Sequence, residues 1–363
     1  EVVFRGNWKT IPSSLFSGTG IEKLVIPEGV TEIGAGAFSG SSLKEVVLPR
    51  TLTKIGDSTF SGTQLTRLTL PEGITEIGSS AFSGSSLKEV VLPRTLTKIG
   101  DYAFSRTQLK DITLPTSVTS IGREAFGAID SLSSVVIPKN LSNAYGAFWG
   151  SQHLKTIHFE EGITKIADGL FQGSGISSIN IPETVTEIGS SAFSGSSLKE
   201  VVLPRTLTKI GDYAFSRTQL KDITLPTSVT SIGREAFGAI DSLSSVVIPK
   251  NLSNAYGAFW GSQHLKTIHF EEGITKIADG LFQGSGISSI NIPETVTEIG
   301  SSAFSGTQLT NMSVPSSVRE IGSYAFNSTP LEVINLSYGL QIIGSGAFRN
   351  TKLETIEIPE GVT

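Results

Sequence analysis

A 22-residue unit repeats along almost the whole chain, and this period limits the possible folds more than any other feature. Fifteen full units run from Ile21 to Lys352, with a partial unit in residues 1–20 and another in residues 353–363. In chains with short internal repeats, each repeat packs on its neighbours in the sequence and the repeats build one extended array. We therefore expect residues 1–363 to form a single solenoid rather than several globular domains.

A longer duplication is superimposed on the short period. The segments 75–195 and 186–306 are identical over 121 positions at an offset of 111, which corresponds to five units. Core packing restrains only the buried positions, so identity at the surface positions as well indicates recent duplication or deliberate construction. Any special site inside this block must occur twice.

The apolar residues of a unit fall at fixed positions. In the unit that starts at Leu87, numbered here from position 1 to position 22, they are Leu87, Val90, Leu92, Leu96, Ile99, Ala103 and Phe104. Positions 3 to 6 alternate between polar and apolar residues and precede a proline, which predicts a short strand. Residues 96–100 alternate again and predict a second strand. One such turn cannot bury its own apolar side, so we expect a right-handed solenoid whose first strands pair as a parallel inner sheet.

The rest of the unit contains a glycine and an Ala-Phe pair. Gly100, at position 14, predicts a residue with positive φ or a close approach between two backbones. The Ala103-Phe104 pair is too short for an α-helix and predicts a 3₁₀ turn that places the ring in the core. Phenylalanine recurs at this position in nearly every unit. We interpret it as a core column rather than as an aromatic binding stripe.

Composition excludes several classes of protein. The chain has no cysteine, so it has neither disulfides nor thiolate metal sites. A net charge of −5 and the lack of a basic cluster argue against nucleic-acid binding, and apolar runs of at most three residues argue against membrane insertion. The four histidines form two sequence pairs, and five residues of extended chain span roughly 16 Å, too far for one pair to share a metal. We expect no catalytic residues, no metal and no cofactor.

The repeated pattern L-x-x-[VI]-x-[LI]-P-x-x-[LV]-T-x-I-G-x-x-A-F resembles the BspA-like class of leucine-rich repeats, and every unit contributes to the resemblance. It implies a curved solenoid with a concave parallel sheet, found on secreted or cell-surface proteins of bacteria and some protozoa and often associated with adhesion to host proteins. Two features depart from the class. The cysteine that often follows the Ala-Phe pair is replaced here by Ser or Thr, as at Thr63, Thr107 and Ser196, and an asparagine ladder is absent.

Positions 2, 3 and 5 of each unit are expected to point away from the core on the concave face, the surface that such solenoids generally use for binding. The candidate partner-binding residues there are Lys88, Glu89, Val91, Lys110, Asp111, His158, Asn180, Lys199, Glu200, His269 and Asn291. Large anchors such as Trp, Tyr and Arg are missing at position 5, so a broad, weak or multivalent contact fits better than a tight one. A surface that binds nothing stays open as an alternative.

One repeat breaks the pattern and is duplicated with the block. It starts at Leu132 and adds Tyr145 and Trp149, whose copies are Tyr256 and Trp260. These four aromatic residues are either exposed anchors for a partner or caps over a cavity left where Ala144 replaces the usual isoleucine. If they are anchors, the duplication makes the site bivalent.

The sequence thus predicts a non-enzymatic, extracellular or cell-surface leucine-rich repeat protein that uses an extended face to bind a protein or an extracellular-matrix ligand. A second hypothesis is a passive spacer or stalk that holds other domains away from the cell surface. No signal peptide or lipidation motif is seen in this sequence.

Overall fold

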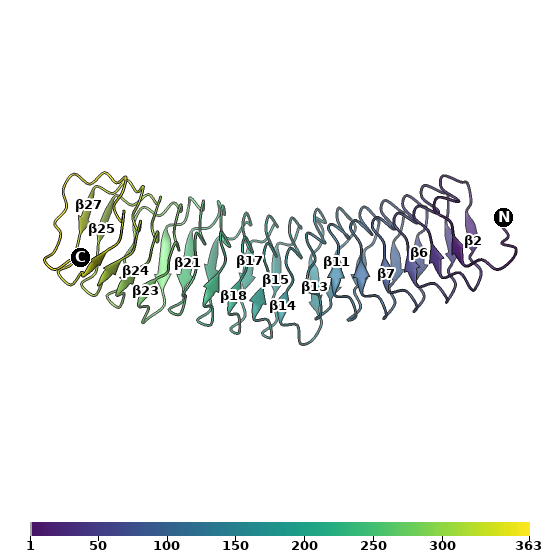
Figure 1. Ribbon diagram of the computed structural model, residues 1–363, viewed down its shortest axis with the longest axis horizontal. Coiled ribbons are helices and arrows are strands. Elements are labelled where there is room, and N and C mark those ends of the chain that lie inside the picture. Colours follow the sequence, from purple (N-terminus) through teal and green to yellow (C-terminus); the bar gives the residue numbers. More distant parts are fainter. Residues whose placement is uncertain (1) are drawn as a thin grey trace. The chain divides into compact units, whose positions relative to one another are not determined.

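The computed structural model describes residues 2–363, which form two compact units, residues 2–177 (unit 1) and Ser178–Thr363 (unit 2). Each unit is a stack of similar turns (Figure 1). Most turns contain two short strands, and residues 2–363 contain no helix. The predicted parallel-strand solenoid is confirmed. Its handedness and the continuity of one array through both units stay predictions.

The strands of unit 1 form two rows. The first row consists of β2 (Lys23–Val25), β4 (Glu45–Val47), β6 (Arg67–Thr69), β8 (Glu89–Val91), β10 (Asp111–Thr113), β12 (Ser134–Ile137) and β13 (Thr156–Phe159). The second row consists of β1 (Thr10–Ile11), β3 (Glu32–Ile33), β5 (Lys54–Ile55), β7 (Glu76–Ile77), β9 (Lys98–Ile99), β11 (Ser120–Ile121) and β14 (Lys165–Ile166). Strands β1, β3, β5, β7, β9 and β11 pair in that order as one parallel sheet.

Unit 2 has the same two rows. The first row consists of β15 (Ser178–Asn180), β17 (Glu200–Val202), β19 (Asp222–Thr224), β21 (Ser245–Ile248), β22 (Thr267–Phe270), β25 (Asn311–Ser313) and β27 (Val333–Asn335). The second row consists of β16 (Glu187–Ile188), β18 (Lys209–Ile210), β20 (Ser231–Ile232), β23 (Lys276–Ile277), β24 (Glu298–Ile299), β26 (Glu320–Ile321) and β28 (Ile342–Ile343). Both predicted strands of the repeat are therefore present.

Pairing within the rows is parallel, but the first row is divided. In unit 1 the first-row strands pair as β2-β4, β6-β8 and β10-β12-β13, and in unit 2 as β15-β17, β19-β21-β22 and β25-β27. Paired residues are one period apart, as in Glu32 opposite Lys54. The expected inner sheet thus consists of ladders of two or three strands.

Phenylalanine rings form the centre of the core. Phe104 is completely buried, and its ring centroid lies 5.0 Å from that of Phe82 and 5.2 Å from that of Phe126, with nearly parallel planes. The same stacking runs from Phe16 to Phe171 in unit 1 and from Phe193 to Phe348 in unit 2. Stacked rings at this spacing gain dispersion energy in addition to their burial. The core-column interpretation of phenylalanine is confirmed.

The segment after the second strand is not a 3₁₀ helix in residues 2–363. The backbone N–H groups of Ala103, Ser105 and Thr107 donate within their own turn, to the carbonyl three residues earlier. The N–H groups of Tyr102, Phe104 and Arg106 instead donate to the next turn of the solenoid, to Arg123, Ala125 and Gly127. Tyr102 and Arg106 have a φ of 56°. This alternation uses half of the donors to join adjacent turns, which a 3₁₀ helix cannot do because its donors all bond inside the helix.

Gly100 shows which of the two expectations for position 14 holds. Its φ is not positive, but a Cβ atom built on it would lie 2.6 Å from the backbone nitrogen of Ser79 and 2.7 Å from the carbonyl carbon of Gly78. Gly100 is therefore glycine because its turn and the preceding turn approach each other too closely for a side chain at this point.

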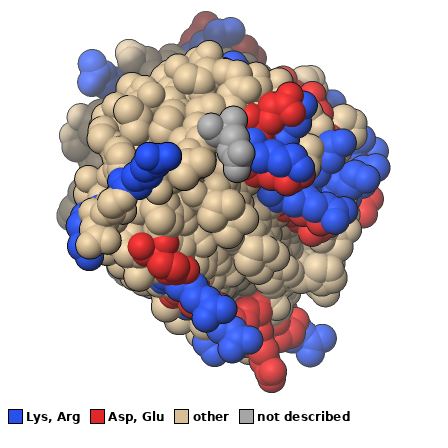
Figure 2. Space-filling model, turned by 90° about the vertical axis from the view of Figure 1, so that its right-hand side faces the viewer, with Lys and Arg blue, Asp and Glu red and all other residues tan. Residues whose placement is uncertain are grey.

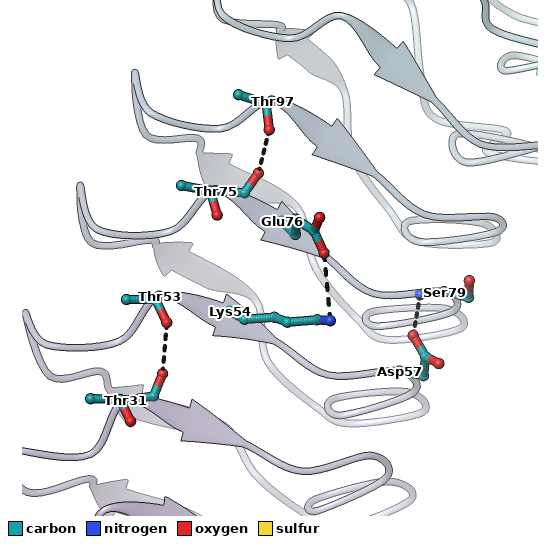
Figure 3. Close-up of polar contacts among 8 residues, drawn as sticks. All are labelled: Thr31, Thr53, Lys54, Asp57, Thr75, Glu76, Ser79 and Thr97. Carbon is teal, nitrogen blue, oxygen red and sulfur yellow. Dashed lines mark hydrogen bonds and ion pairs between the residues drawn. The ribbon is translucent and has the colours of Figure 1, made fainter.

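Threonine and serine provide polar contacts between and within the turns. On the surface, the hydroxyl of Thr53 donates to the carbonyl of Thr31 and that of Thr97 donates to the carbonyl of Thr75, both at 3.1 Å (Figure 3). These threonines form a ladder of hydrogen bonds between turns on the surface. The chain has no asparagine ladder. Where the related class often has cysteine, the hydroxyl of Thr107 donates to the carbonyl of Phe104 at 2.8 Å, while the Oγ of Ser85 has no partner among residues 2–363.

One carboxylate connects three turns and gives the fold a predicted pH dependence. Oε1 of Glu160 accepts from the hydroxyl of Thr116 at 2.7 Å, two turns earlier, and Oε2 accepts from the backbone N–H of Lys139 at 3.0 Å. These hydrogen bonds hold the pKa of Glu160 below its ordinary value of 4.5, and Glu271 in unit 2 is held in the same way by Lys250 and Thr227.

A lowered folded-state pKa means that this contribution to stability is present above pH 4.5 and is lost as the pH falls through the folded-state pKa. We expect the double variant Glu160→Gln with Glu271→Gln to unfold at a lower temperature than wild type at neutral pH, and this difference to shrink below pH 4.5. Thermal unfolding followed by circular dichroism across this pH range measures it, with the exposed neighbour Glu161→Gln as the control. A difference that stays constant with pH contradicts the assignment.

Candidate functional site

The candidate residues of the predicted concave face are all exposed. In unit 1 they lie on or just before β8, β10 and β13, and in unit 2 on or just before β15, β17 and β22, except Asn291, which lies outside any strand. In the three-residue strands among these, the central residue points toward the core and its two neighbours point out, as in β8, where Val91 has 59% of its surface exposed. Lys88 to Asp111 occupy two consecutive turns, whereas His158 lies two turns beyond Asp111.

Charged side chains at this face are only partly paired. Glu89 forms an ion pair with Arg67 of the preceding turn at 3.0 Å, with both side chains largely exposed. Such surface pairs contribute little to stability. Within residues 2–363, Lys88, Lys110 and Lys199 make no ion pair within 4.0 Å. Figure 2, which views the molecule from the right-hand side of Figure 1, shows basic and acidic side chains mixed in patches, with a largely uncharged area beside them.

Several of the cationic side chains line an open groove in unit 2. It has a volume of about 650 Å³ and is lined by Lys199, Arg217, Thr218, Gln219, Lys221, Ala239, Asp241 and Ser242. Lys199 was among the predicted residues, whereas Arg217 and Gln219 were missed. Arg217 and Gln219 lie at the end of the repeat that starts at Leu198. They line the groove together with Lys199 and Lys221, which lie at the start of this repeat and of the next one. A second groove, in unit 1, is lined by Lys44, Glu45, Gln64, Thr66, Ser86, Lys88 and Gln108. It uses the same repeat positions 2 and 22 as the groove in unit 2, but it is not its duplicated copy.

The aromatic residues of the irregular repeat lie elsewhere, in the turns that follow the isolated bridge residues Asn143 and Asn254. Tyr145 is 60% exposed and Trp149 is 49% exposed, and their copies Tyr256 and Trp260 are 52% and 50% exposed. Trp149 rests on Gly173 of the next turn, where an added Cβ atom would lie 2.2 Å from Cδ1 of the indole. The residues are therefore exposed, as the anchor hypothesis requires, while one edge of each indole packs on a neighbouring glycine.

Neighbouring turns complete a pocket around these aromatic residues. In unit 1 it has a volume of about 600 Å³ and is lined by Arg123, Glu124, Tyr145, Gly146, Trp149 and Gln172. Arg123, Glu124 and Gln172 were missed from the sequence. The period contains the signal, because Arg123 precedes Tyr145 by one period and Gln172 follows Trp149 by one period plus a single insertion.

The described residues do not assemble a metal centre. Among residues 2–363, no group of three or more His, Asp and Glu side chains could hold a metal ion. His158 and His269 are exposed on the first-row strands β13 and β22, as predicted. The part of the chain that is described also has no helix long and apolar enough to cross a membrane.

Comparisons with known proteins agree with this architecture. The family model for the BspA type leucine rich repeat region matches residues 9–133, 54–175, 164–285 and 253–363. A leucine-rich repeat protein from Bacteroides ovatus has a similar structure, with 27% sequence identity, a TM-score of 0.57, and coverage of 94% of this chain and 79% of that one. No curated protein sequence matches the chain.

Two further solved structures share the fold. One is a leucine-rich repeat protein from Eubacterium ventriosum, with 22% identity, a TM-score of 0.51, and coverage of 94% of this chain and 91% of that one. The other is the pneumococcal vaccine antigen PcpA, with 23% identity, a TM-score of 0.51, and coverage of 90% of this chain and 84% of that one.

Proposed function

Because the chain belongs to the BspA-type leucine-rich repeat family, we propose that it is a non-enzymatic extracellular or cell-surface protein that binds a protein or matrix partner along its first-row strands. The groove at Lys199, Arg217 and Lys221 is the single observation that carries this proposal. Three cations and one carboxylate, that of Asp241, line it, so it fits an acidic segment of a partner.

The exposure and spacing of the candidate side chains also support binding at this face. Lys199 and its copy Lys88 are free of ion pairs within residues 2–363, so a partner gains contact with them without first breaking a pair. The 111-residue duplication repeats the residues of the groove, and two linked sites gain avidity without any new contact. This argument favours a broad, multivalent contact.

Charge reversal on the first-row side tests the proposal. Lys88, Lys110, Lys199 and Lys221 are changed to Glu together, and binding is measured against a panel of immobilised host extracellular-matrix proteins. We expect affinity for an acidic partner to fall by about tenfold or more, because each cation becomes a repulsive charge. The matched control is Lys98→Glu with Lys209→Glu, which makes the same kind of change on the second-row strands β9 and β18.

Equal binding by the fourfold variant and the control variant would contradict binding at the first-row face.

Deletion of residues 75–185 separates a binder from a passive spacer, because it removes one copy of the block and keeps the period. A multivalent binder loses avidity on this deletion, whereas a spacer keeps the activity of whatever it holds.

A further inference from the structure

We propose that units 1 and 2 each contain, apart from the first-row face, a binding site for a neutral carbohydrate chain at the exposed tryptophan. In unit 1 this aromatic pocket consists of Arg123, Glu124, Tyr145, Trp149 and Gln172. The duplicated residues Arg234, Glu235, Tyr256, Trp260 and Gln283 give unit 2 the same side chains.

The backbone holds the aromatic pocket in a fixed conformation. The N–H of Trp149 donates to the carbonyl of Gly146 at 2.8 Å, and the carbonyl of Trp149 accepts from the N–H of Ala128 at 2.8 Å. Gly173 leaves room for the indole, since any side chain there would overlap it. A ligand that binds this pocket therefore does not need to order a loop, and loop ordering is one of the free-energy costs of binding.

The charges of the pocket favour an uncharged ligand. Nε of Arg123 lies 3.1 Å from Oε1 of Glu124, and the copies Arg234 and Glu235 have the same separation. The guanidinium would repel a cationic ligand and the carboxylate would repel an anionic one. Their remaining N–H groups and oxygen lone pairs still provide donors and acceptors at the edge of the pocket.

The combination of aromatic and polar groups matches a sugar ring. The side-chain amide of Gln172, which lines the pocket, makes no hydrogen bond within residues 2–363, so its donor and acceptor are available to adjacent hydroxyls. The faces of Trp149 and Tyr145 have negative quadrupoles, which attract the polarised C–H bonds on one side of a sugar ring. Open pockets of this kind orient a ligand with a few polar groups around an apolar surface.

A peptide fits this pocket less well. An extended peptide usually binds by adding a strand to an open sheet edge. Here the backbone groups around the aromatic residues are used between turns, as in the N–H of Gly146 to the carbonyl of Gly169 at 2.7 Å and the N–H of Gly150 to the carbonyl of Gly173 at 3.0 Å. The turns therefore offer side chains to a ligand but no strand edge.

Tryptophan fluorescence tests this proposal directly, because the chain has only three tryptophans. In a Trp8→Phe background the signal comes from Trp149 and Trp260 alone. The protein is titrated with soluble neutral oligosaccharides derived from cellulose, chitin, starch and mannan, at concentrations up to about 10 mM to cover weak single-site binding. We expect at least one of them to change the emission, and calorimetry to give two ligand molecules per chain.

Variants assign that binding to the pocket. Trp149→Ala should halve the number of sites and Trp149→Ala with Trp260→Ala should abolish binding, while thermal unfolding by circular dichroism checks that both variants fold. Gln172→Ala with Gln283→Ala leaves the aromatic surface intact and should weaken binding, whereas the exposed Gln308→Ala should not.

Three results would overturn the proposal: no response to any of the oligosaccharides, binding that persists in the double tryptophan variant, or tryptophan-dependent binding of gelatin peptides when no sugar binds. The first-row charge reversals should leave sugar binding unchanged, so failure of one proposal does not decide the other.

Discussion

Replacing Phe104 with alanine should lower the free energy of unfolding by about 3–5 kcal/mol, the usual loss when a large buried aromatic side chain is truncated. Phe104 is fully buried and contacts a ring on each side, 5.0 Å away at Phe82 and 5.2 Å away at Phe126. The variant therefore loses its own burial and leaves a cavity that two rigid neighbours line. Denaturation in urea, followed by circular dichroism, measures the change.

The large effect should depend on burial and not on removing an aromatic ring as such. Tyr338 is 90% exposed, so Tyr338→Ala is the matched control and should change stability by less than about 0.5 kcal/mol. In an array, each turn is stabilised by its nearest neighbours, so the Phe104→Ala defect should loosen the adjacent turns first. Compared with wild type, backbone amide hydrogen exchange should therefore increase most in the turns around Phe104. Equal stability losses in the two variants would contradict the core-column interpretation.

The second large effect is expected from a single added methyl group. Gly100→Ala places a Cβ atom 2.6 Å from the backbone nitrogen of Ser79 and 2.7 Å from the carbonyl carbon of Gly78. Both contacts are with backbone, which cannot rotate away as a flexible side chain can, so two turns must separate. We expect a loss of about 3 kcal/mol or more, at the upper end of the range for overpacking.

Gly20→Ala is the control for this variant, because Gly20 has no positive φ and an added Cβ atom there would meet no other atom within 4 Å. It should be neutral or slightly stabilising, since alanine reduces the freedom of the unfolded chain. The melting temperatures of the two variants give the comparison. If Gly100→Ala has the same melting temperature as wild type, the two turns are not in close contact at Gly100.

The two candidate surfaces differ in how visible they are in the sequence. The first-row residues such as Lys88 and His158 are found by counting positions within one repeat, because a strand exposes alternate residues. The aromatic pocket combines Arg123, Trp149 and Gln172 from three consecutive turns. Only Tyr145 and Trp149 depart from the repeat pattern, so their polar neighbours look like ordinary surface residues until the turns are aligned.

The sequence by itself determined the solenoid, the two strands of each turn, the buried positions and the phenylalanine column, because each of these follows from apolar residues that recur within one 22-residue period. The tertiary structure decided the rest. It showed that Tyr102 and Arg106 adopt positive φ so that alternate N–H groups reach the next turn, that Gly100 is needed for contact rather than for its φ, and that Arg123 lies beside Trp149. These features depend on contacts between successive turns, and the pattern inside one turn does not contain the distances or directions of those contacts.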